Sequence, residues 1–274
     1  MAIKAFFVDT TKCTGCRACQ VACKQWNNLP AEKTEFFGGI EYTNPKELSA
    51  VTYNHVKFFT IDRQMPEKPV WQIMHKKCYH CKTANCMTVC PQKAISKSNG
   101  WTIIDQNKCI GCGACEEKCI YNVPHVSKKE FMEYGTGKTI QKNKSYKCHA
   151  CLLNKRDTPA CVTACPTGAL TIDLRIAIIK AAKKRLKDVK EDFPKASIYG
   201  MDQFGGLNVI TLLKNNPRKY GLELNPKPIK LADSNIINDL YTLLSLFTLG
   251  LPSLKRVAYR IAKTITSTDN RMAS

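Results

Sequence analysis

The chain has 274 residues, a formal net charge of +20 and 16 cysteines, with 44% apolar and 23% charged residues. This composition is typical of a globular protein with a hydrophobic core, which excludes a disordered or fibrous chain. A disulfide-stabilised scaffold is excluded as well, because such scaffolds are usually much shorter chains with too small a core. So many cysteines in a chain of this length therefore need a chemical explanation.

The first predicted element is a short strand at the N-terminus. Residues 5–9 read Ala-Phe-Phe-Val-Asp, an apolar run that leads towards the first cysteine. Residues 1–9 hold no basic region, no long hydrophobic stretch and no small-residue cleavage site, so we expect a strand and not a signal peptide. If this protein is exported, a partner protein must carry it.

The cysteines fall into four sets of four along the chain. The first and third sets have the spacing C-x2-C-x2-C-x3-C, which is that of bacterial ferredoxins, and the second and fourth sets widen one gap. In order, the sets are Cys13, Cys16, Cys19 and Cys23; Cys78, Cys81, Cys86 and Cys90; Cys109, Cys112, Cys115 and Cys119; and Cys148, Cys151, Cys161 and Cys165. This spacing lets one tight loop wrap three corners of an iron-sulfur cube, so four 4Fe-4S clusters are the predicted cofactors.

Zinc sites, disulfides and thioredoxin-like sites fit this cysteine pattern less well. A zinc site needs two C-x2-C pairs, and a third cysteine two residues further on is redundant for one ion. A disulfide framework does not need this periodicity in four copies, and a thioredoxin-like redox site needs a single C-x2-C. His80 and His149 each lie between the first two cysteines of a set. We expect them to be exposed or to bond to a cluster sulfur, in preference to ligating a metal.

Residues 24–77 separate the first two sets and are predicted to be an inserted region of strands. Residues 51–61 and 70–74 alternate between apolar and polar side chains, which is the pattern of half-buried strands. We expect these strands to pack beside the clusters and to cover them.

The segment between the second and third sets predicts a β-hairpin. Two short apolar runs flank Asn99-Gly100, the preferred dipeptide of a type I′ turn. Loop, short helix, hairpin, loop and short helix is the layout of a two-cluster ferredoxin, so residues 78–144 are predicted to form an inner unit. Residues 1–23 and 145–175 are left as partners and are predicted to form an outer unit around it. The expected fold is α+β, with two interleaved ferredoxin-like units.

This pairing of the sets predicts the cluster ligands. In two-cluster ferredoxins the fourth cysteine of each run binds the other cluster of the pair. The rule predicts four sites, numbered I to IV here. Site I consists of Cys13, Cys16, Cys19 and Cys165; site II of Cys148, Cys151, Cys161 and Cys23; site III of Cys78, Cys81, Cys86 and Cys119; and site IV of Cys109, Cys112, Cys115 and Cys90.

Residues 176–274 are predicted to form a basic tail. Apolar residues recur at helical spacing after residue 176, and lysines cover the other faces, which predicts an amphipathic helix. The apolar positions are Ile178, Ile179, Ala182, Leu186 and Val189. Its basic face is expected to be solvated, or to dock on a partner or an anionic surface. Residues 1–175 carry 25 Lys and Arg against 14 Asp and Glu, an excess that four anionic clusters would largely neutralise.

Residues 240–254 form an apolar segment within this tail. The segment carries no charge and is bounded by Asp239 and Lys255. As a helix it would span about 22 Å, which is short of the roughly 30 Å hydrocarbon layer, and Gly250 and Pro252 would break it. We therefore expect an interfacial segment, or one buried against a partner subunit, in preference to a transmembrane span.

Three stretches resemble the iron-sulfur (beta) subunit of formate dehydrogenases. They are residues 5–27, around the first set, residues 109–115 in the third set, and residues 159–169, which contain the end of the fourth set. The resemblance covers about residues 3–173, and residues 208–220 also resemble the end segment of the short, soluble form of that subunit. The broader family comprises the four-cluster subunits of molybdopterin oxidoreductases.

The resemblance implies an electron-transfer subunit with no catalytic centre of its own. Electrons from formate oxidation at a molybdenum or tungsten bis-pterin site in a separate catalytic subunit would pass along four 4Fe-4S clusters to a cytochrome or membrane subunit. In that family the ligands pair as predicted above, and site I faces the catalytic subunit. Ile120 follows Cys119 where the family usually has proline, which is expected to shift the potential of a nearby cluster.

The resemblance also implies a compartment. Relatives without a signal peptide are commonly exported folded with a signal-bearing partner, which implies the periplasm or the outer face of the cytoplasmic membrane. A cytoplasmic complex is the alternative. Contact of the tail with a membrane surface would be peripheral.

Three alternative functions follow from the same residues. A molybdopterin reductase acting on polysulfide, arsenate or dimethyl sulfoxide would use the same kind of subunit. A free-standing polyferredoxin would carry the same clusters but does not need the long insert and tail. A nucleic-acid-binding protein is suggested only by the charge, and we expect no nucleic-acid partner.

Overall fold

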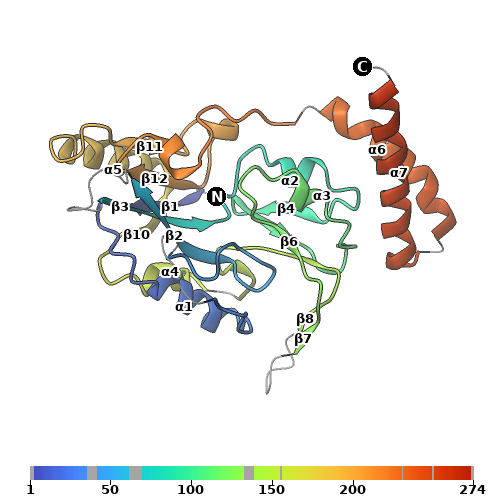
Figure 1. Ribbon diagram of the computed structural model, residues 1–274, viewed down its shortest axis with the longest axis horizontal. Helices are drawn as coiled ribbons and strands as arrows, with labels where there is room; N and C mark the ends of the chain where they lie inside the picture. The colour runs from blue at the N-terminus through green and yellow to red at the C-terminus, as the bar shows by residue number, and fades with distance from the viewer. Residues whose placement is uncertain are drawn as a thin grey trace.

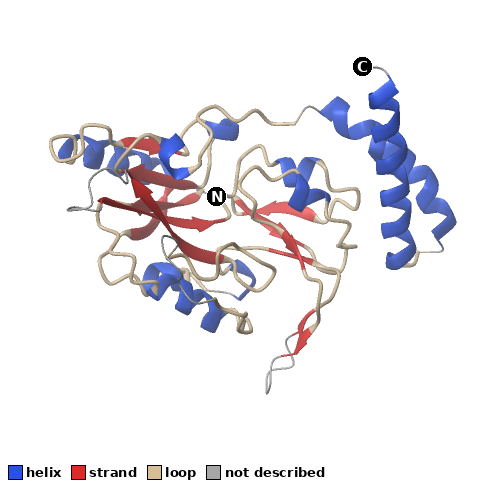
Figure 2. Cartoon of the chain, in the orientation of Figure 1, coloured by secondary structure: helices blue, strands red, loops and turns tan. Residues whose placement is uncertain are grey.

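A computed structural model of the chain describes residues 3–35, 42–61, 70–132, 139–154, 156–229, 231–248 and 250–272. Strands and short helices alternate through most of the chain, so the fold is α+β, as predicted. Two groups of strands lie side by side, and a pair of longer helices near the C-terminus stands at one end (Figure 1). Figure 2 shows that the remaining helices flank the strands of both groups.

The central sheet joins strands from both ends of the cysteine-bearing region. Its members are β1 (Lys4–Asp9), β10 (Leu170–Leu174), β11 (Ser197–Tyr199) and β12 (Val209–Leu213), in the order β10-β1-β12-β11. β1 pairs antiparallel with β10, with Phe6 opposite Ile172, and parallel with β12, with Phe6 opposite Val209. Because β1 leads into the first cysteine set and β10 leaves the fourth, their pairing brings these two sets together.

The position of β12 corrects the predicted extent of the tail. All five residues of β12 are buried, and the strand lies between β1 and β11 inside the sheet. Residues 197–213 therefore belong to the main body, and the segment predicted as a tail from residue 176 leaves this body only after β12. A strand buried on both faces does not alternate, and its partner β1 lies about 200 residues earlier, so the local sequence pattern did not reveal it.

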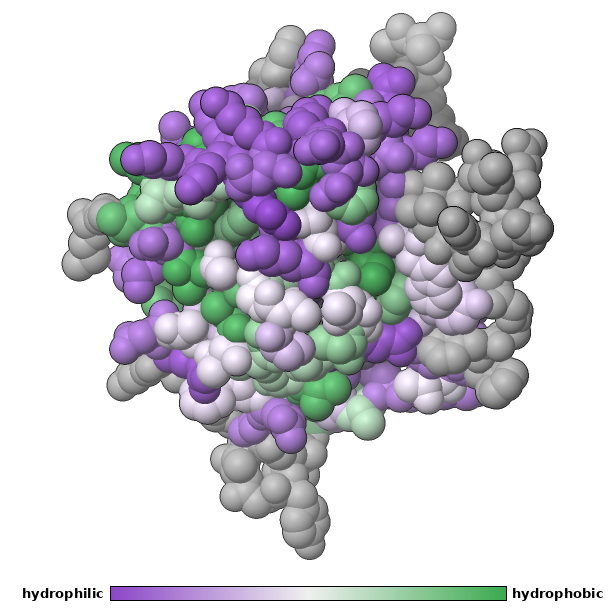
Figure 3. Space-filling model, turned by 90° about the vertical axis from the view of Figure 1, so that its left-hand side faces the viewer, coloured by the Kyte–Doolittle hydropathy of each residue, from purple (hydrophilic) through white to green (hydrophobic). Residues whose placement is uncertain are grey.

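α5 (Arg175–Asp188) covers one face of this sheet and is the amphipathic helix predicted after residue 176. Ile178 and Ala182 are buried in an apolar cluster shared with β1 and β12. Hydrophilic residues gather over the upper part of the face shown in Figure 3, at the height where α5 lies in Figure 1. Arg185 Nε lies 3.0 Å from Asp9 Oδ2, and this ion pair with a buried carboxylate ties α5 to β1.

The insert forms an antiparallel hairpin of β2 (Asn54–Ile61) and β3 (Val70–Lys77), in the two stretches predicted as strands. Phe58 and Ile73 stand opposite each other on this hairpin. A Cβ atom added at Gly15, in the first cysteine loop, would lie 2.9 Å from the Phe58 ring and 3.1 Å from Ile73. The hairpin therefore packs directly on this loop, as expected.

The segment from the second to the fourth cysteine set is built from short elements. They are α2 (Asn85–Thr88), β4 (Ile95–Ser98), β5 (Trp101–Ile104), α3 (Ala114–Glu117), β6 (His125–Val126), β7 (Phe131–Met132), β8 (Thr139–Ile140) and β9 (Ser145–Tyr146). β6 pairs with β9, and β7 with β8. β4 and β5 form the predicted hairpin, and Asn99 and Gly100 at its turn have φ angles of 49° and 84°. Both positive angles are what a type I′ turn requires.

The other helical pieces lie beside the cysteines or after the sheet. They are α1 (Ala18–Trp26), η1 (Leu152–Asn154), α4 (Ala160–Thr163), η2 (Gln203–Gly205) and η3 (Pro217–Tyr220). α1 packs against α4, and α2 packs against α3. The helices of the first and fourth sets therefore form one pair, and those of the second and third sets form another.

A helical hairpin follows the main body. It consists of α6 (Leu231–Ser245), η4 (Leu246–Thr248) and α7 (Pro252–Met272). The apolar segment 240–254 is therefore broken at Gly250, with φ of 78°, and at Pro252, as predicted. Tyr241 and Ala262, on the inner side of the hairpin, pack in one apolar cluster with Ile110. Within the ranges that the structure describes, no helix is both long enough and apolar enough to cross a membrane.

Two shortened chains should show that folding needs β12 but does not need the helical hairpin. A chain that ends at residue 175 loses β12, whose four buried aliphatic side chains stabilise the fold by about 1.5–3 kcal/mol each. That loss matches the roughly 5–15 kcal/mol total stability of a domain, so we expect this chain to be insoluble. A chain that ends at residue 229 keeps the whole sheet and should remain soluble and bind iron. Soluble yield and iron content measure both outcomes, and equal behaviour of the two chains would show that β12 is dispensable.

Candidate metal centres

The four cysteine sets share one local structure. The third cysteine of each set lies in a short helix, and these residues are Cys19, Cys86, Cys115 and Cys161. The residue just before the second cysteine has a positive φ in every set, and these residues are Gly15, His80, Gly111 and Ala150. Left-handed backbone is uncommon outside glycine. Its recurrence at the same position therefore shows that all four loops make the same turn.

At site I the predicted thiols affect the pKa values of Cys19 and Cys13. Burial first, and then the thiols of Cys161, Cys13, Cys16 and Cys165, raise the pKa of Cys19 to about 12. Cys165 is also among the groups that raise the pKa of Cys13, after burial. The first set and the last cysteine of the fourth set therefore lie together.

At site III the fourth thiol again comes from the other set of its pair. Burial, and then the thiols of Cys78, Cys119 and Cys81, raise the pKa of Cys86. Cys119 belongs to the third set, whereas the other three thiols belong to the second. The thiols of the two sets therefore lie near one another here.

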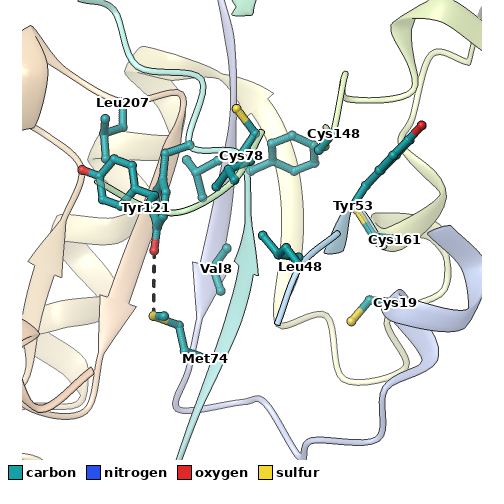
Figure 4. Packing of buried hydrophobic residues seen from close by; sticks show 14 of the residues in the cluster. Val8, Cys19, Leu48, Tyr53, Met74, Cys78, Tyr121, Cys148, Cys161 and Leu207 are labelled. Atoms are coloured by element: carbon teal, nitrogen blue, oxygen red, sulfur yellow. Dashed lines mark hydrogen bonds between the residues drawn. The ribbon is translucent and has the colours of Figure 1, made fainter. Parts of the chain in front are cut away.

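At sites II and IV the four thiols line a common cavity. Cys23, Cys148, Cys151 and Cys161 line one cavity together with Tyr53 and Lys77. Cys90, Cys109, Cys112 and Cys115 line another, beside Ser145. Figure 4 shows Cys19, Cys78, Cys148 and Cys161 among aromatic and aliphatic side chains. The structure therefore brings close together the thiols that the sequence assigns to each of these two sites.

The donor groups fit 4Fe-4S clusters. In the part of the chain that the structure describes, no three His, Cys, Asp or Glu side chains are spaced to hold a single metal ion. A cube of four irons needs its thiols spread around a larger group. Backbone N–H groups also donate to the sulfur atoms: His80 N lies 3.4 Å from Cys78 Sγ, and Ala150 N lies 3.4 Å from Cys148 Sγ. Such donors stabilise the thiolate form that binds iron.

Buried lysines were not predicted from the sequence, and they fit an anionic cofactor. Lys77 and Lys147 are buried, and Lys97 is partly buried, yet none of the three forms an ion pair with a carboxylate among the described residues. A buried charge is stable only near an opposite charge. Clusters with four thiolates are anionic and would supply that charge. A signal for these residues existed, because a lysine directly precedes the first cysteine in all four sets.

The four sites follow one another in a row. The thiol of Cys161 in site II is the first electrostatic influence, after burial, on Cys19 in site I. The thiol of Cys78 in site III contributes to the raised pKa of Cys148 in site II, and the thiol of Cys86 in site III contributes to the raised pKa of Cys115 in site IV. Neighbouring thiols therefore connect the sites in the order I, II, III, IV.

Four groups of thiols in a row, on an α+β ferredoxin-like fold, define an electron-transfer protein with four 4Fe-4S clusters. Two family models, both described as 4Fe-4S dicluster domains, match residues 12–94 and 69–175. Together they span every cysteine set.

Curated relatives identify the family more closely. The chain is 32% identical over 231 residues to the iron-sulfur subunit of the nitrate-inducible formate dehydrogenase of Escherichia coli K12. This alignment covers 81% of this chain and 73% of the relative. It is 32% identical to formate dehydrogenase 2 subunit beta (cytochrome c-553) of Nitratidesulfovibrio vulgaris and 31% identical to formate dehydrogenase subunit beta of Megalodesulfovibrio gigas. Each of these two alignments covers 79% of this chain and 96% of the relative. The chain belongs to the family of formate dehydrogenase iron-sulfur subunits, which are electron-transfer subunits without a catalytic centre of their own.

Proposed function

We propose that the chain relays electrons between a pterin-dependent formate dehydrogenase catalytic subunit and a cytochrome or membrane partner, through one cluster at each of sites I to IV. The row of four thiol groups carries this proposal. Each 4Fe-4S cluster, when bound, takes up and releases a single electron. The chain itself holds the clusters in order and keeps water away from most of their thiols, since nine of the sixteen cysteines are buried.

We assign the ligands as the thiol groups suggest, with the fourth cysteine of each set serving the other site of its pair. The same grouping supports two interleaved two-cluster units. The outer unit joins the first and fourth sets through the β1 and β10 pair, and the inner unit joins the second and third sets around the β4 and β5 hairpin. The insert 24–77 and strand β12 complete the outer unit.

Site I is the proposed entrance from the catalytic subunit. Cys16 is exposed, and Cys13 and Cys165 are partly exposed, so this site lies near the surface. Val21, on α1 between Cys19 and Cys23, is 57% exposed. An exposed apolar side chain beside a surface-near site suits a contact with another subunit.

Site IV is the proposed exit, next to the helical hairpin of α6 and α7. Exposed apolar side chains form a stripe along α7 and also lie near the end of α6 and at the tip of the hairpin. They are Leu243, Leu246, Phe247, Leu251, Leu254, Val257, Ile261 and Ile265. Arg260 is exposed beside the stripe. An apolar stripe next to cations suits peripheral binding to an anionic membrane surface, where the acceptor would lie, on the periplasmic face in this proposal.

Two substitutions at opposite ends of the molecule should test both contacts. Val21→Glu should abolish co-purification with the pterin subunit but leave binding to phosphatidylglycerol-containing vesicles unchanged. Phe247→Glu, at a side chain that is 83% exposed, should reduce vesicle sedimentation at least several-fold and leave co-purification intact. Both positions are exposed, so neither change should affect the iron content. Each variant serves as the control for the other.

Different results would contradict the subunit contact and the membrane contact. If no pterin subunit co-purifies with the unaltered chain, the chain is a free-standing polyferredoxin and the subunit proposal is wrong. If unaltered chain binds pure phosphatidylcholine vesicles as well as anionic ones, or neither kind, the membrane contact at the hairpin is wrong. Protease protection in spheroplasts would distinguish a periplasmic from a cytoplasmic complex.

A further inference from the structure

A cavity of about 200 Å³ lies where the insert, the outer unit and the inner unit meet. Its lining residues come from all three parts and include Asn28 after α1, Gln106 after β5 and His149 in the fourth cysteine loop. Asn27, Tyr53 and His149 line this cavity and also the smaller cavity of site II. A single layer of side chains therefore separates this larger cavity from the thiols of site II.

Tyr53 presents a hydroxyl group without a partner to this cavity. The residue is 7% exposed, so more than nine-tenths of it is buried. Its ring meets the His149 ring edge-on, with the centroids 6.2 Å apart, and Figure 4 shows the hydroxyl group pointing away from Leu48 and Cys161. Within the described ranges, the hydroxyl group forms no hydrogen bond. An unpaired hydroxyl group in the interior is destabilising, so this O–H is available as a donor to a ligand.

The other polar groups around the cavity also favour a ligand with acceptor oxygens. The hydroxyl oxygen of Tyr146 accepts a hydrogen bond from Gln141 N at 2.9 Å, and its own proton is donated to none of the described residues. Lys147 lines the cavity as well, is 4% exposed, and its Nζ donates to the backbone oxygen of Cys148 at 3.0 Å. A buried ammonium group disfavours a cationic ligand and favours oxygen atoms that carry partial negative charge.

The walls and the volume suit one aromatic ring. Ile104, Ile140 and Leu153 line the cavity together with the rings of Tyr53 and Tyr146. An apolar cavity of about 150 Å³ binds one benzene ring, so a cavity of about 200 Å³ has room for one ring with small substituents. A whole nucleotide, with base, sugar and phosphate, exceeds this volume.

We propose that this cavity binds the head group of a benzoquinone. Such a head group is a single flat ring with two carbonyl oxygens, which accept hydrogen bonds and donate none. The ring matches the apolar walls, and its oxygens match the O–H groups of Tyr53 and Tyr146. A quinone bound here lies beside site II, within the row of sites, whereas the acceptor proposed above lies beside site IV at its end. The inference concerns a second binding site and does not depend on the ligand assignment of the clusters.

Calorimetric titration of the reconstituted full-length chain with duroquinone, in the absence of oxygen, tests the proposal. Duroquinone is a benzoquinone whose four methyl groups block the addition of thiols to its ring, which matters in a chain with 16 cysteines. We expect one molecule to bind per chain. The matched ligand is 2,3,5,6-tetramethylbenzoate, which has a similar ring with a carboxylate in place of the carbonyl oxygens, and it should bind more weakly.

Two variants test the position of the site. Tyr53→Phe removes one hydrogen bond and should weaken duroquinone binding about five-fold. Ile140→Trp places a larger ring in the cavity from a partly buried position and should abolish binding. The controls are Tyr259→Phe, at a buried tyrosine elsewhere in the chain, and Ile176→Trp, at a side chain that is 85% exposed. Neither control should change the affinity.

The proposal is overturned if duroquinone does not bind, or if Ile140→Trp binds it as tightly as the unaltered chain. Tighter binding of the benzoate would assign the cavity to aromatic carboxylates instead. Iron content is measured for every variant, and if Tyr53→Phe loses iron, Ile140→Trp decides the question. The titration needs no pterin subunit and no membrane, so a negative result would leave the proposed electron relay intact.

Discussion

A chain with both Cys81→Ala and Cys119→Ala should lose one cluster, whereas a chain with both Cys112→Ala and Cys119→Ala should lose two. Four clusters bring about sixteen iron atoms per chain, so we expect about twelve in the first variant and about eight in the second. Cys119 and Cys112 are close in sequence, but the structure groups Cys119 with Cys78, Cys81 and Cys86. Removal of two ligands from one cluster costs no more iron than removal of one.

Iron and sulfide analysis of the purified full-length chain measures this result. The single variants Cys81→Ala, Cys112→Ala and Cys119→Ala are the controls, and each should retain about twelve iron atoms. The reverse order, with about eight iron atoms in the Cys81 and Cys119 variant, would mean that each set binds its own cluster. About eight iron atoms in the unaltered chain would contradict the presence of four clusters.

Gly111→Ala should strongly destabilise the chain, whereas Gly113→Ala should have a small effect. Both glycines have positive φ, at 64° and 87°, so each substitution costs about 1–2 kcal/mol of backbone strain. A Cβ atom at Gly111 would lie 2.0 Å from the backbone oxygen of Asn143, which cannot move as a side chain would. A Cβ atom at Gly113 would meet nothing within 4 Å. Overpacking adds about 1–3 kcal/mol at Gly111 alone.

The Gly111 change should also reduce cluster binding at site IV. Gly111 lies between Cys109 and Cys112, and the segment it would displace includes Ser145, whose N–H lies 3.4 Å from Cys109 Sγ. We expect the loss of about four iron atoms, together with a lower urea midpoint. Gly113→Ala lies in the same loop and controls for strain alone. Equal midpoints and iron contents for the two variants would show that contact with Asn143 does not determine stability.

Several features of the fold could be predicted because they depend on neighbouring residues. The Asn99-Gly100 turn requires two positive φ angles, and these residues supply them at low cost. The insert hairpin follows from two alternating stretches, and the break in the apolar segment follows from Gly250 and Pro252. In each case the relevant physical preference is contained within a few consecutive residues.

Strand β12 and the buried lysines could not be predicted in this way. Val209 pairs with Phe6, and only that long-range contact makes residues 209–213 part of the central sheet. Lys77 and Lys108 occupy equivalent sequence positions before a cysteine, yet only Lys77 is buried. Local sequence cannot distinguish the two, because burial depends on which distant elements cover the side chain.

The sequence by itself determined the cofactor, since the cysteine spacing is a local property and one loop must supply three thiolates to each cluster. It also indicated which sets pair, through the hairpin between the second and third sets and the sharing of the fourth cysteine. Only the tertiary structure decided the order of the four sites and the charges around each of them. Those properties depend on contacts between residues far apart in the chain, such as Lys147 with the backbone oxygen of Thr102 and Lys77 with the thiol of Cys161. Such contacts form only when the whole chain has folded.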